Sequence, residues 1–379
     1  MKLYITGGGT GGHVTPGLAI ARYFEKKQPQ TTVRFAGSAR GIENKLVPRE
    51  GYPLDTIEII GMSRSMSPKG ILHNLKAAKL AVSAVSKAKK LLKQAKPDCV
   101  IGCGGYASFA VVRAAQQLGI PTVLLEVNAL PGKVPQMLAK DADRVLVCFE
   151  QAKELLGGGD KIILTGAPVR GEILGADRAK AREKFGLTDD DQLVVSFWGS
   201  MGAKYMNEHM AGELALECKN GVPYHHVHAT GAAAREWLPR MAKDQGADFD
   251  AHPNIEVTEY IYDMADRMAA ADLIVCRAGA ATLGELCMLG RPALLVPSPY
   301  VAENHQEKNA RALEKEGGCR VLLEKDANPQ VLYDEIQDLL SDRDRLHRMG
   351  HDATKLAAHD ASEKIYQEIL WAIENHGKK

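Results

Sequence analysis

The sequence predicts an α/β protein with two Rossmann-like, doubly wound parallel-sheet domains. Short runs of β-branched and other apolar residues alternate with helical stretches along the whole chain, which is typical of parallel sheets covered by helices. The runs are continuously apolar, as in QLVVSFWG (192–199), and such runs are typical of strands buried on both faces. The length of 379 residues exceeds that of one ordinary domain and favours two.

The first half of the chain holds six predicted strands and ends at a hinge. In chain order the strands are KLYIT, TTVRFAG, DCVIG, PTVLLEV, DRVLVC and KIILTG. The segment APVR (167–170) follows the sixth strand, and we interpret it as the connection between the domains. Residues 1–168 are therefore predicted to form the first domain.

The second half repeats the alternation after the charged helix ADRAKAREKFG. Its predicted strands are QLVVSFWG, YHHVHATG, DLIVCRAG, PALLVP and CRVLLE, and residues 169–360 form the second domain. The last helix (361–376) has no strand after it, so we expect it to pack back on the first domain. Ligands bind beyond the carboxyl ends of the strands in such sheets, so two facing domains are expected to form a cleft.

Composition and charge exclude several classes of protein. Hydrophobic residues make up 45% and charged residues 25% of the chain, as in a soluble globular protein. A formal net charge of +1 gives no general attraction to nucleic acid, so any electrostatic function depends on local charge. Seven cysteines without a CxxC pair indicate reduced thiols in a cytosolic compartment. We expect no signal peptide and no membrane-spanning helix.

A glycine-rich turn, GGGTGGHVTPG (7–17), follows the first strand and opens a helix. Its glycines let backbone N–H groups approach an anion at the positive end of the helix dipole, so the turn predicts a phosphate-bearing ligand. It lacks the GK[ST] of a P-loop and the acid of a dinucleotide fingerprint. The alternative is a purely structural tight turn. His13 stands at its mouth, where it either accepts a proton from a substrate hydroxyl or hydrogen-bonds the loop.

Three further turns of small residues follow later strands. They are IGCGGYASFA (101–110), WGSMGAKYMNE (198–208) and CRAGAATLGEL (276–286), and together the four turns predict a site lined with N–H donors. Glu285 lies one helical turn beyond Ala281 and Thr282, where a carboxylate accepts both hydroxyls of a ribose. The alternative is an ordinary first-turn glutamate favoured by the helix dipole. TDDDQ (188–192) precedes a strand and fits turn chemistry, so no metal site is predicted.

A basic segment lies in the first half. From Ile59 to Pro97 the chain has no acidic residue but nine lysines and arginines, and the part from residue 71 to 96 has a helical pattern with interspersed apolar residues. Such a helix is attracted to an anionic membrane surface. The residues expected to contact the membrane are Ile71, Leu75, Lys76, Lys79, Lys87 and Lys90. The alternative is a core-packed helix with a solvated lysine face.

Seven short motifs, in order and spacing, resemble the MurG family of peptidoglycan glycosyltransferases over essentially the whole chain. They are GGGTGGH, GCGGY, LLEVN, GAPVR, GSMGA, CRAGAATLGE and HQEKNA. The resemblance implies a GT-B type fold and a hexosyltransferase that moves N-acetylglucosamine from UDP-N-acetylglucosamine, with inversion, to the 4-hydroxyl of undecaprenyl-pyrophosphoryl-N-acetylmuramoyl-pentapeptide. It also implies no metal or other cofactor and a peripheral location on the cytoplasmic face of the bacterial cell membrane.

The resemblance also assigns site residues. Contacts to UDP-N-acetylglucosamine fall on Thr10, Gly11, Gly12, Asn128, Arg170, Ser200, Ile261, Ala280, Ala281, Thr282, Leu283, Gly284, Glu285 and Gln306. The pyrophosphate of the acceptor falls on Gly104, Gly105 and Tyr106. His13 is the implied base, with Glu126 as competitor. The chain departs from the family pattern at Val127, Met201 and His305, and a proline usual after GGY is missing.

Three other interpretations stay open at this point. A nucleotide-dependent dehydrogenase would use the glycine turns, but it needs a nicotinamide site and a ribose-reading acid after the second strand. A UDP-N-acetylglucosamine epimerase, or a lipid glycosyltransferase with another acceptor, would have the same fold. A catalytically inactive membrane-binding module would keep the basic helix and lose the donor site.

Overall fold

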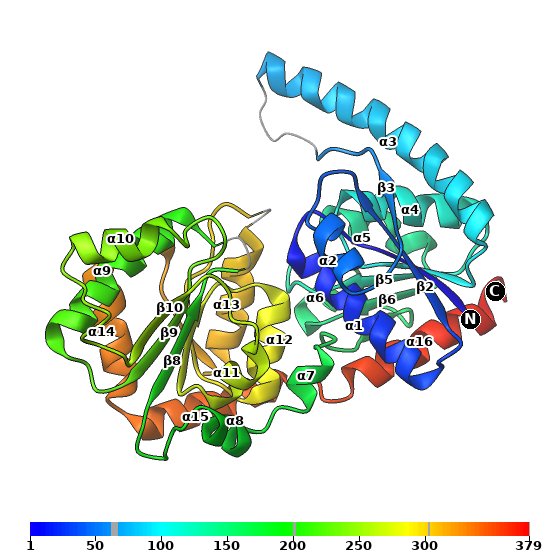
Figure 1. Ribbon diagram of the computed structural model, residues 1–379. Helices are drawn as coiled ribbons and strands as arrows, with labels where there is room; N and C mark the ends of the chain where they lie inside the picture. Colours follow the sequence, from blue (N-terminus) through cyan, green and yellow to red (C-terminus); the bar gives the residue numbers. More distant parts are fainter. Residues whose placement is uncertain (62–66, 200–201, 302–303, 379) are drawn as a thin grey trace. The chain divides into compact units, whose positions relative to one another are not determined.

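The computed structural model describes residues 1–61, 67–199, 202–301 and 304–378 and divides the chain into two compact units (Figure 1). Unit 1 comprises Met1–Arg170 and Ala358–Lys379, and unit 2 comprises Gly171–Ala357. The division after Arg170 lies at the end of the APVR segment, two residues beyond the boundary expected from the sequence.

Unit 1 is built on a seven-stranded parallel sheet with the order β3-β2-β1-β4-β5-β6-β7. The strands are β1 (Lys2–Thr6), β2 (Thr32–Ser38), β3 (Leu54–Ile57), β4 (Cys99–Gly102), β5 (Thr122–Glu126), β6 (Arg144–Val147) and β7 (Ile162–Leu164). The helices are α1 (Gly11–Lys27), α2 (Glu43–Arg49), α3 (Pro68–Ala95), α4 (Tyr106–Gln117), α5 (Lys133–Leu138), α6 (Glu150–Leu155) and α16 (Ala361–Asn375). The core lies between α3, α4 and the central strands, with residues such as Val100, Val111 and Leu124 fully buried.

The carboxyl-terminal helix α16 belongs to unit 1. It packs on α1, where the rings of Phe24 and Tyr366 lie 4.7 Å apart, and on the sheet, where Arg144 Nε lies 2.5 Å from Glu368 Oε2. This segment therefore closes one face of the sheet formed by the amino-terminal half of the chain.

Unit 2 is built on a six-stranded parallel sheet with the order β10-β9-β8-β11-β12-β13. Its strands are β8 (Leu193–Phe197), β9 (His225–Ala229), β10 (Ile255–Thr258), β11 (Leu273–Cys276), β12 (Ala293–Leu295) and β13 (Cys319–Val321). Its helices are α7 (Gly171–Leu174), α8 (Arg178–Lys184), α9 (Lys204–Asn220), α10 (Trp237–Asp244), α11 (Met264–Ala270), α12 (Ala280–Leu289), α13 (His305–Lys315), α14 (Pro329–Leu340) and α15 (Arg343–Ala353). Apolar clusters fill both faces of the sheet.

All eleven predicted strands are present, and the structure adds two that the sequence analysis missed, β3 and β10. Both are edge strands of four residues, LDTI and IEVT, in which an acidic residue interrupts the apolar pattern. An edge strand faces a neighbour on one side only and tolerates polar residues, so it lacks the continuous apolar run that marks a central strand.

Candidate active site

The four glycine turns meet in two pairs, one pair in each unit. The turns of unit 1 follow the adjacent strands β1 and β4, and those of unit 2 follow the adjacent strands β8 and β11, where Ser200 and Met201 lie outside the described residues. In both sheets the strand order reverses between these two strands, and this switch point is where open α/β sheets bind ligands. Each unit therefore has its own candidate binding edge, built from residues far apart in the sequence.

The two turns of unit 1 are interlocked through their backbones. The N–H of Gly8 donates to the carbonyl oxygen of Gly104 at 3.3 Å. Gly104 and Gly105 have φ values of +104° and +83°, which favour glycine. A Cβ added at Gly105 would lie 2.3 Å from the carbonyl oxygen of Gly8, so no side chain fits. This contact holds the mouth of the first turn in a fixed conformation.

A buried carboxylate leaves no room for a side chain at several of the glycine positions. Glu43, at the start of α2, is fully buried and accepts hydrogen bonds from Gly9 N (2.9 Å), Ser38 N (2.7 Å) and Ser38 Oγ (2.7 Å). A Cβ added at Gly8 or Gly41 would lie 2.3 or 2.0 Å from a Glu43 oxygen. Part of the glycine pattern is therefore structural, as the alternative interpretation held. The sequence analysis missed Glu43, although an acid beside Ser38 and Gly41 was its visible signal.

His13 lies in the first turn of α1, half-buried, with its ring against Gly104. Its Nδ1 is 3.1 Å from the carbonyl oxygen of Gly8 and 3.3 Å from Thr10 Oγ1. A carbonyl oxygen only accepts, so this contact favours the tautomer in which Nδ1–H donates to Gly8. The basic lone pair then belongs to Nε2, which is the arrangement a general base requires.

Glu126, the competing base, is placed differently. It ends β5 with 4% of its surface exposed and accepts hydrogen bonds from Asn128 N (2.8 Å), Asn128 Nδ2 (2.9 Å) and Gly132 N (2.7 Å). Burial raises the pKa of this carboxyl group, and the hydrogen bonds from Gly132 and Asn128 oppose that rise. The carboxylate thus organises the loop after β5 and orients Asn128. This geometry favours His13 as the group that meets a substrate.

In unit 2 the first turn of α12 is a candidate anion site. Its N-cap is Gly279, and no capping side chain among the described residues bonds the N–H groups that follow it. Ala280, Ala281 and Thr282 begin the helix, so their N–H groups lie at its positive end. Leu283 is buried in the core beside Ile261, and Glu285 is 7% exposed. Gly284 is half-buried in the same helix.

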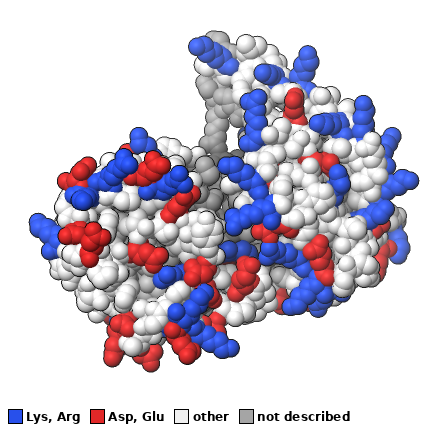
Figure 2. All heavy atoms as spheres, in the orientation of Figure 1, with Lys and Arg blue, Asp and Glu red and all other residues white. Residues whose placement is uncertain are grey.

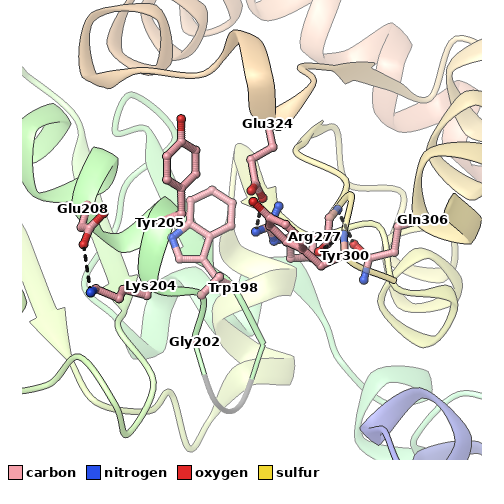
Figure 3. A pocket seen from close by; sticks show the side chains of 11 residues that line it. Trp198, Gly202, Lys204, Tyr205, Glu208, Arg277, Tyr300, Gln306 and Glu324 are labelled. Atoms are coloured by element: carbon pink, nitrogen blue, oxygen red, sulfur yellow. Dashed lines mark hydrogen bonds and ion pairs between the residues drawn. The ribbon is translucent and has the colours of Figure 1, made fainter. Parts of the chain in front are cut away.

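A pocket of about 540 Å³ opens at the same edge of unit 2 (Figure 3). It is lined by residues that follow four neighbouring strands, among them Trp198, Arg277, Gln306 and Glu324. Arg277 Nη2 lies 2.5 Å from Glu324 Oε2, and its guanidinium stands 5.7 Å from the centre of the Trp198 ring. Burial lowers the pKa of Arg277, and the nearby Glu324 opposes this shift.

Two polar groups of this pocket can orient a ligand. Gln306 Oε1 accepts from the N–H of Ser298 at 2.9 Å, which fixes the side-chain amide (Figure 3). The indole N–H of Trp198 is buried and has no hydrogen-bond partner among the described residues. The sequence analysis quoted the motif that contains Arg277 but did not single out this residue, and it missed Trp198 and Glu324. Only the meeting of several strand ends brings them together.

The remaining predicted site residues are distributed over both units. Thr10, Gly11 and Gly12 form the start of α1, and Gly105 and the half-exposed Tyr106 form the start of α4, all in unit 1. Arg170 is half-buried at the end of unit 1. Ser200 and Met201 lie outside the described residues. Val127 is buried, and His305 begins α13.

Two parallel sheets, each with glycine turns at its switch point, are the architecture of a GT-B type fold. Models of the glycosyltransferase family 28 N-terminal and C-terminal domains match residues 3–147 and 193–365. A protein of Acetivibrio thermocellus named UDP-N-acetylglucosamine--N-acetylmuramyl-(pentapeptide) pyrophosphoryl-undecaprenol N-acetylglucosamine transferase is 43% identical over 375 residues, which are 99% of each chain. The crystal structure of Acinetobacter baumannii MurG superposes with a TM-score of 0.74 at 29% identity and covers 98% of this chain and 99% of the other.

The chain therefore belongs to glycosyltransferase family 28 and, within it, to the MurG family of N-acetylglucosamine transferases. The resemblance noted from the motifs is confirmed, and the dehydrogenase interpretation is wrong. A UDP-GlcNAc 2-epimerase of Neisseria meningitidis superposes with a TM-score of 0.65 over 98% of this chain and 100% of its own, but at 16% identity. That likeness shows a common fold alone.

Proposed function

We propose that this protein transfers N-acetylglucosamine from UDP-N-acetylglucosamine to the 4-hydroxyl of undecaprenyl-pyrophosphoryl-N-acetylmuramoyl-pentapeptide, which converts lipid I to lipid II. The relative that is 43% identical over 99% of the chain carries this reaction in its name. The structural observation that supports it most directly is the pairing of an imidazole base site in unit 1 with an uncapped helix start and a pocket in unit 2.

The donor is proposed to bind on unit 2. The N–H groups at the start of α12 would hold its diphosphate, because partial positive charge gathers at a helix amino terminus. Glu285, one turn further, would accept the ribose hydroxyls, and the backbone at Ile261 would read uracil. The oriented amide of Gln306 would contact sugar hydroxyls. Thr10, Gly11, Gly12, Asn128, Arg170 and Ser200 stay predicted donor contacts.

The acceptor is proposed to meet the base in unit 1, with its pyrophosphate near Gly104, Gly105 and Tyr106. His13 Nε2 takes the proton of the 4-hydroxyl as that oxygen attacks the anomeric carbon. The bond from this carbon to the diphosphate oxygen breaks in the same step, and UDP leaves with its electron pair. Helix N–H groups stabilise the charge on the leaving diphosphate, so no metal ion is required. Attack opposite to the leaving group inverts an α-donor into a β-linkage.

Membrane docking is proposed for α3, because one face of this helix is apolar and exposed. Ile71, Leu75 and Val82 lie on that face with exposures of 53%, 65% and 71%. The opposite face is buried against unit 1 through Ala84, Ala88 and Leu92. The packed-helix interpretation therefore describes one face of α3 and leaves the other without a partner among the described residues.

Exposed lysines accompany the apolar face along the whole helix (Figure 2). They include Lys76, Lys79, Lys87 and Lys90, and each contributes about 1 kcal/mol near an anionic leaflet. Among the described residues, no helix combines the length and apolar character needed to cross a membrane. We propose that the protein is peripheral, on the cytoplasmic face of the cell membrane.

A single assay tests the reaction. The protein is incubated with UDP-N-acetylglucosamine labelled in the sugar and a short-chain lipid I analogue, with and without EDTA. We expect the label to appear in the acceptor in both samples. Label found in an epimerised nucleotide sugar, with none in the acceptor, would identify an epimerase instead. Complete loss of transfer in EDTA, restored by magnesium, would contradict the metal-free mechanism.

A further inference from the structure

The interior of unit 2 contains a cluster of ionisable side chains that the proposed reaction does not use. Glu213 and Glu217 lie one turn apart on α9, and His226 lies on the neighbouring strand β9. All three are fully buried. One ligating atom from each side chain lies within 4.8 Å of the other two. The surrounding side chains are mostly apolar, including Met210, Leu214, Ile336 and Leu339 on the same side of the sheet.

The hydrogen bonds on the far side of His226 fix its tautomer. Asn207 Nδ2 donates to the carbonyl oxygen of Thr230 at 2.7 Å, so Asn207 Oδ1 is the atom that accepts from His228 Nε2 at 3.3 Å. A neutral His228 whose Nε2–H donates to Asn207 has its lone pair on Nδ1, which then accepts from the hydroxyl of Ser196 at 2.7 Å. The Ser196 oxygen in turn accepts from His226 Nε2–H at 2.7 Å.

This chain of donors leaves the Nδ1 of a neutral His226 with a lone pair. That lone pair points at Glu217, whose two carboxylate oxygens lie 2.9 and 3.0 Å away. Two acceptors at this distance require a positive charge, which either a proton on Nδ1 or a bound metal ion supplies. Metal-binding histidines usually donate the N–H of their other ring nitrogen to an acceptor that fixes the ring, as His226 Nε2–H does here to Ser196.

Glu213 also requires a positive charge or a hydrogen-bond donor beside its carboxylate. Neither of its oxygens has a hydrogen-bond donor among the described residues, although the side chain is completely buried. Glu217 already accepts from the hydroxyl of Tyr224 at 2.6 Å, and its carboxylate adjoins that of Glu213. Two buried carboxylates with His226 as their only nearby candidate counter-charge among the described residues are unfavourable, since one imidazolium cannot neutralise both. One divalent ion would neutralise both charges and satisfy the lone pair of His226.

We propose that Glu213, Glu217 and His226 bind one divalent transition-metal ion of the zinc class inside unit 2. Imidazole and carboxylate oxygen suit zinc, with bonds of about 2.0 to 2.2 Å that place tetrahedral ligands roughly 3.3 Å apart. The Tyr224 hydroxyl, beside Glu217, is placed to hydrogen-bond a ligand or to complete the coordination. Because the ion would join α9 to β9 in the core, its role is structural, and turnover needs no exchangeable metal.

Metal analysis of the purified protein tests this site. The protein is produced with zinc in the medium, passed over a chelating resin and measured by mass spectrometry of the metal. We expect about one zinc ion per chain in the wild type, and less than about a tenth of that in Glu213→Gln. The matched control is Glu236→Gln, an exposed glutamate of the same unit, which should keep the wild-type content.

A refolding experiment with the wild type distinguishes two ways of neutralising the cluster, by one metal ion or by two protons. Refolded with zinc, the protein should melt about 5 to 10 °C higher than when refolded with a chelator. In Glu213→Gln an amide can donate to Glu217 as a shared proton would, and this variant should show no such difference. A wild type that contains no zinc after refolding with it, and melts at the same temperature in both samples, would overturn the proposal and assign the cluster to shared protons.

Discussion

Each unit carries a parallel sheet with glycine turns at its switch point, but the surroundings of the turns differ between the units. In unit 1 they are bonded to each other, and the N–H of Gly9 is already used by the buried Glu43. In unit 2 the start of α12 has no capping side chain among the described residues, and a pocket opens nearby. Similar glycine-rich sequence patterns therefore have different structural roles. The helices of all three described turns, α1, α4 and α12, begin without a side-chain cap, but only the turns of unit 1 hold a candidate base, with the His13 ring against Gly104.

The largest effect on catalysis is expected from the rigid turn of unit 1. His13→Ala should lower kcat by about 100-fold or more, because the acceptor hydroxyl loses its base, while UDP affinity stays within a few fold. Steady-state kinetics with a soluble lipid I analogue and calorimetry with UDP measure the two quantities. His359→Ala, an exposed histidine, serves as control.

A second substitution sharpens this test. Glu126→Ala should instead destabilise unit 1, because three hydrogen bonds lose their acceptor. If Glu126→Ala abolishes turnover in a folded protein and His13→Ala does not, the base is Glu126.

The second effect concerns the open turn of unit 2. Glu285→Ala should weaken donor binding about tenfold to a hundredfold, since a charged hydrogen bond to a ribose diol contributes about 1.5 to 3 kcal/mol. Calorimetry with UDP-N-acetylglucosamine gives the dissociation constant, and Glu236→Ala is the matched control. An unchanged constant would remove Glu285 from the donor site.

The two units also show how much of the structure can be predicted from the sequence. Continuous apolar runs revealed most of the central strands, because burial on both faces favours apolar residues. The central strand β9 is an exception, since its buried His226 and His228 are hydrogen-bonded to Ser196. The glycine turns and His13 could also be predicted from the local sequence, because each follows directly after a strand. Glu43, Arg277 and the cluster of Glu213 with His226 were not visible. Their roles depend on contacts between segments far apart in the sequence, such as the 2.7 Å bond between Ser196 and His226.

A smaller effect is expected from the buried acid of unit 1. Glu43→Gln should lower the free energy of unfolding of unit 1 by about 1 to 3 kcal/mol, because an amide donor replaces one of the two carboxylate oxygens and so faces either Gly9 N or Ser38 N. The melting temperature of unit 1 should fall by several degrees, and donor binding to unit 2 should remain unchanged. Glu58→Gln, an exposed acid of unit 1, is the control. An unchanged melting temperature would show that the interlocked turns do not need this carboxylate.

The smallest effect on turnover, and the largest on location, is expected from α3. This helix has 28 residues, whereas the helix at the same place in the topology of unit 2, α11, has 7. The variant reverses four exposed charges of this helix, those of Lys76, Lys79, Lys87 and Lys90, to Glu. It should abolish binding to anionic vesicles, yet leave transfer to a soluble short-chain acceptor nearly intact, because α3 lies outside both glycine turns. Co-sedimentation with vesicles measures the first quantity, and the labelled transfer assay measures the second.

Salt dependence and a matched variant distinguish attraction of the lysines of α3 to the membrane from an effect of the protein's net charge. Wild-type binding should weaken as salt rises, because the Debye length falls from about 10 Å at 0.1 M to about 3 Å at 1 M. The residual binding at high salt would come from Ile71, Leu75 and Val82, each contributing a fraction of its burial value of about 1.5 to 3 kcal/mol. The control makes the same change of net charge at four exposed lysines of unit 2, Lys219, Lys243, Lys315 and Lys325. If both variants lose binding equally, net charge governs it, and if neither does, membrane contact lies elsewhere than α3.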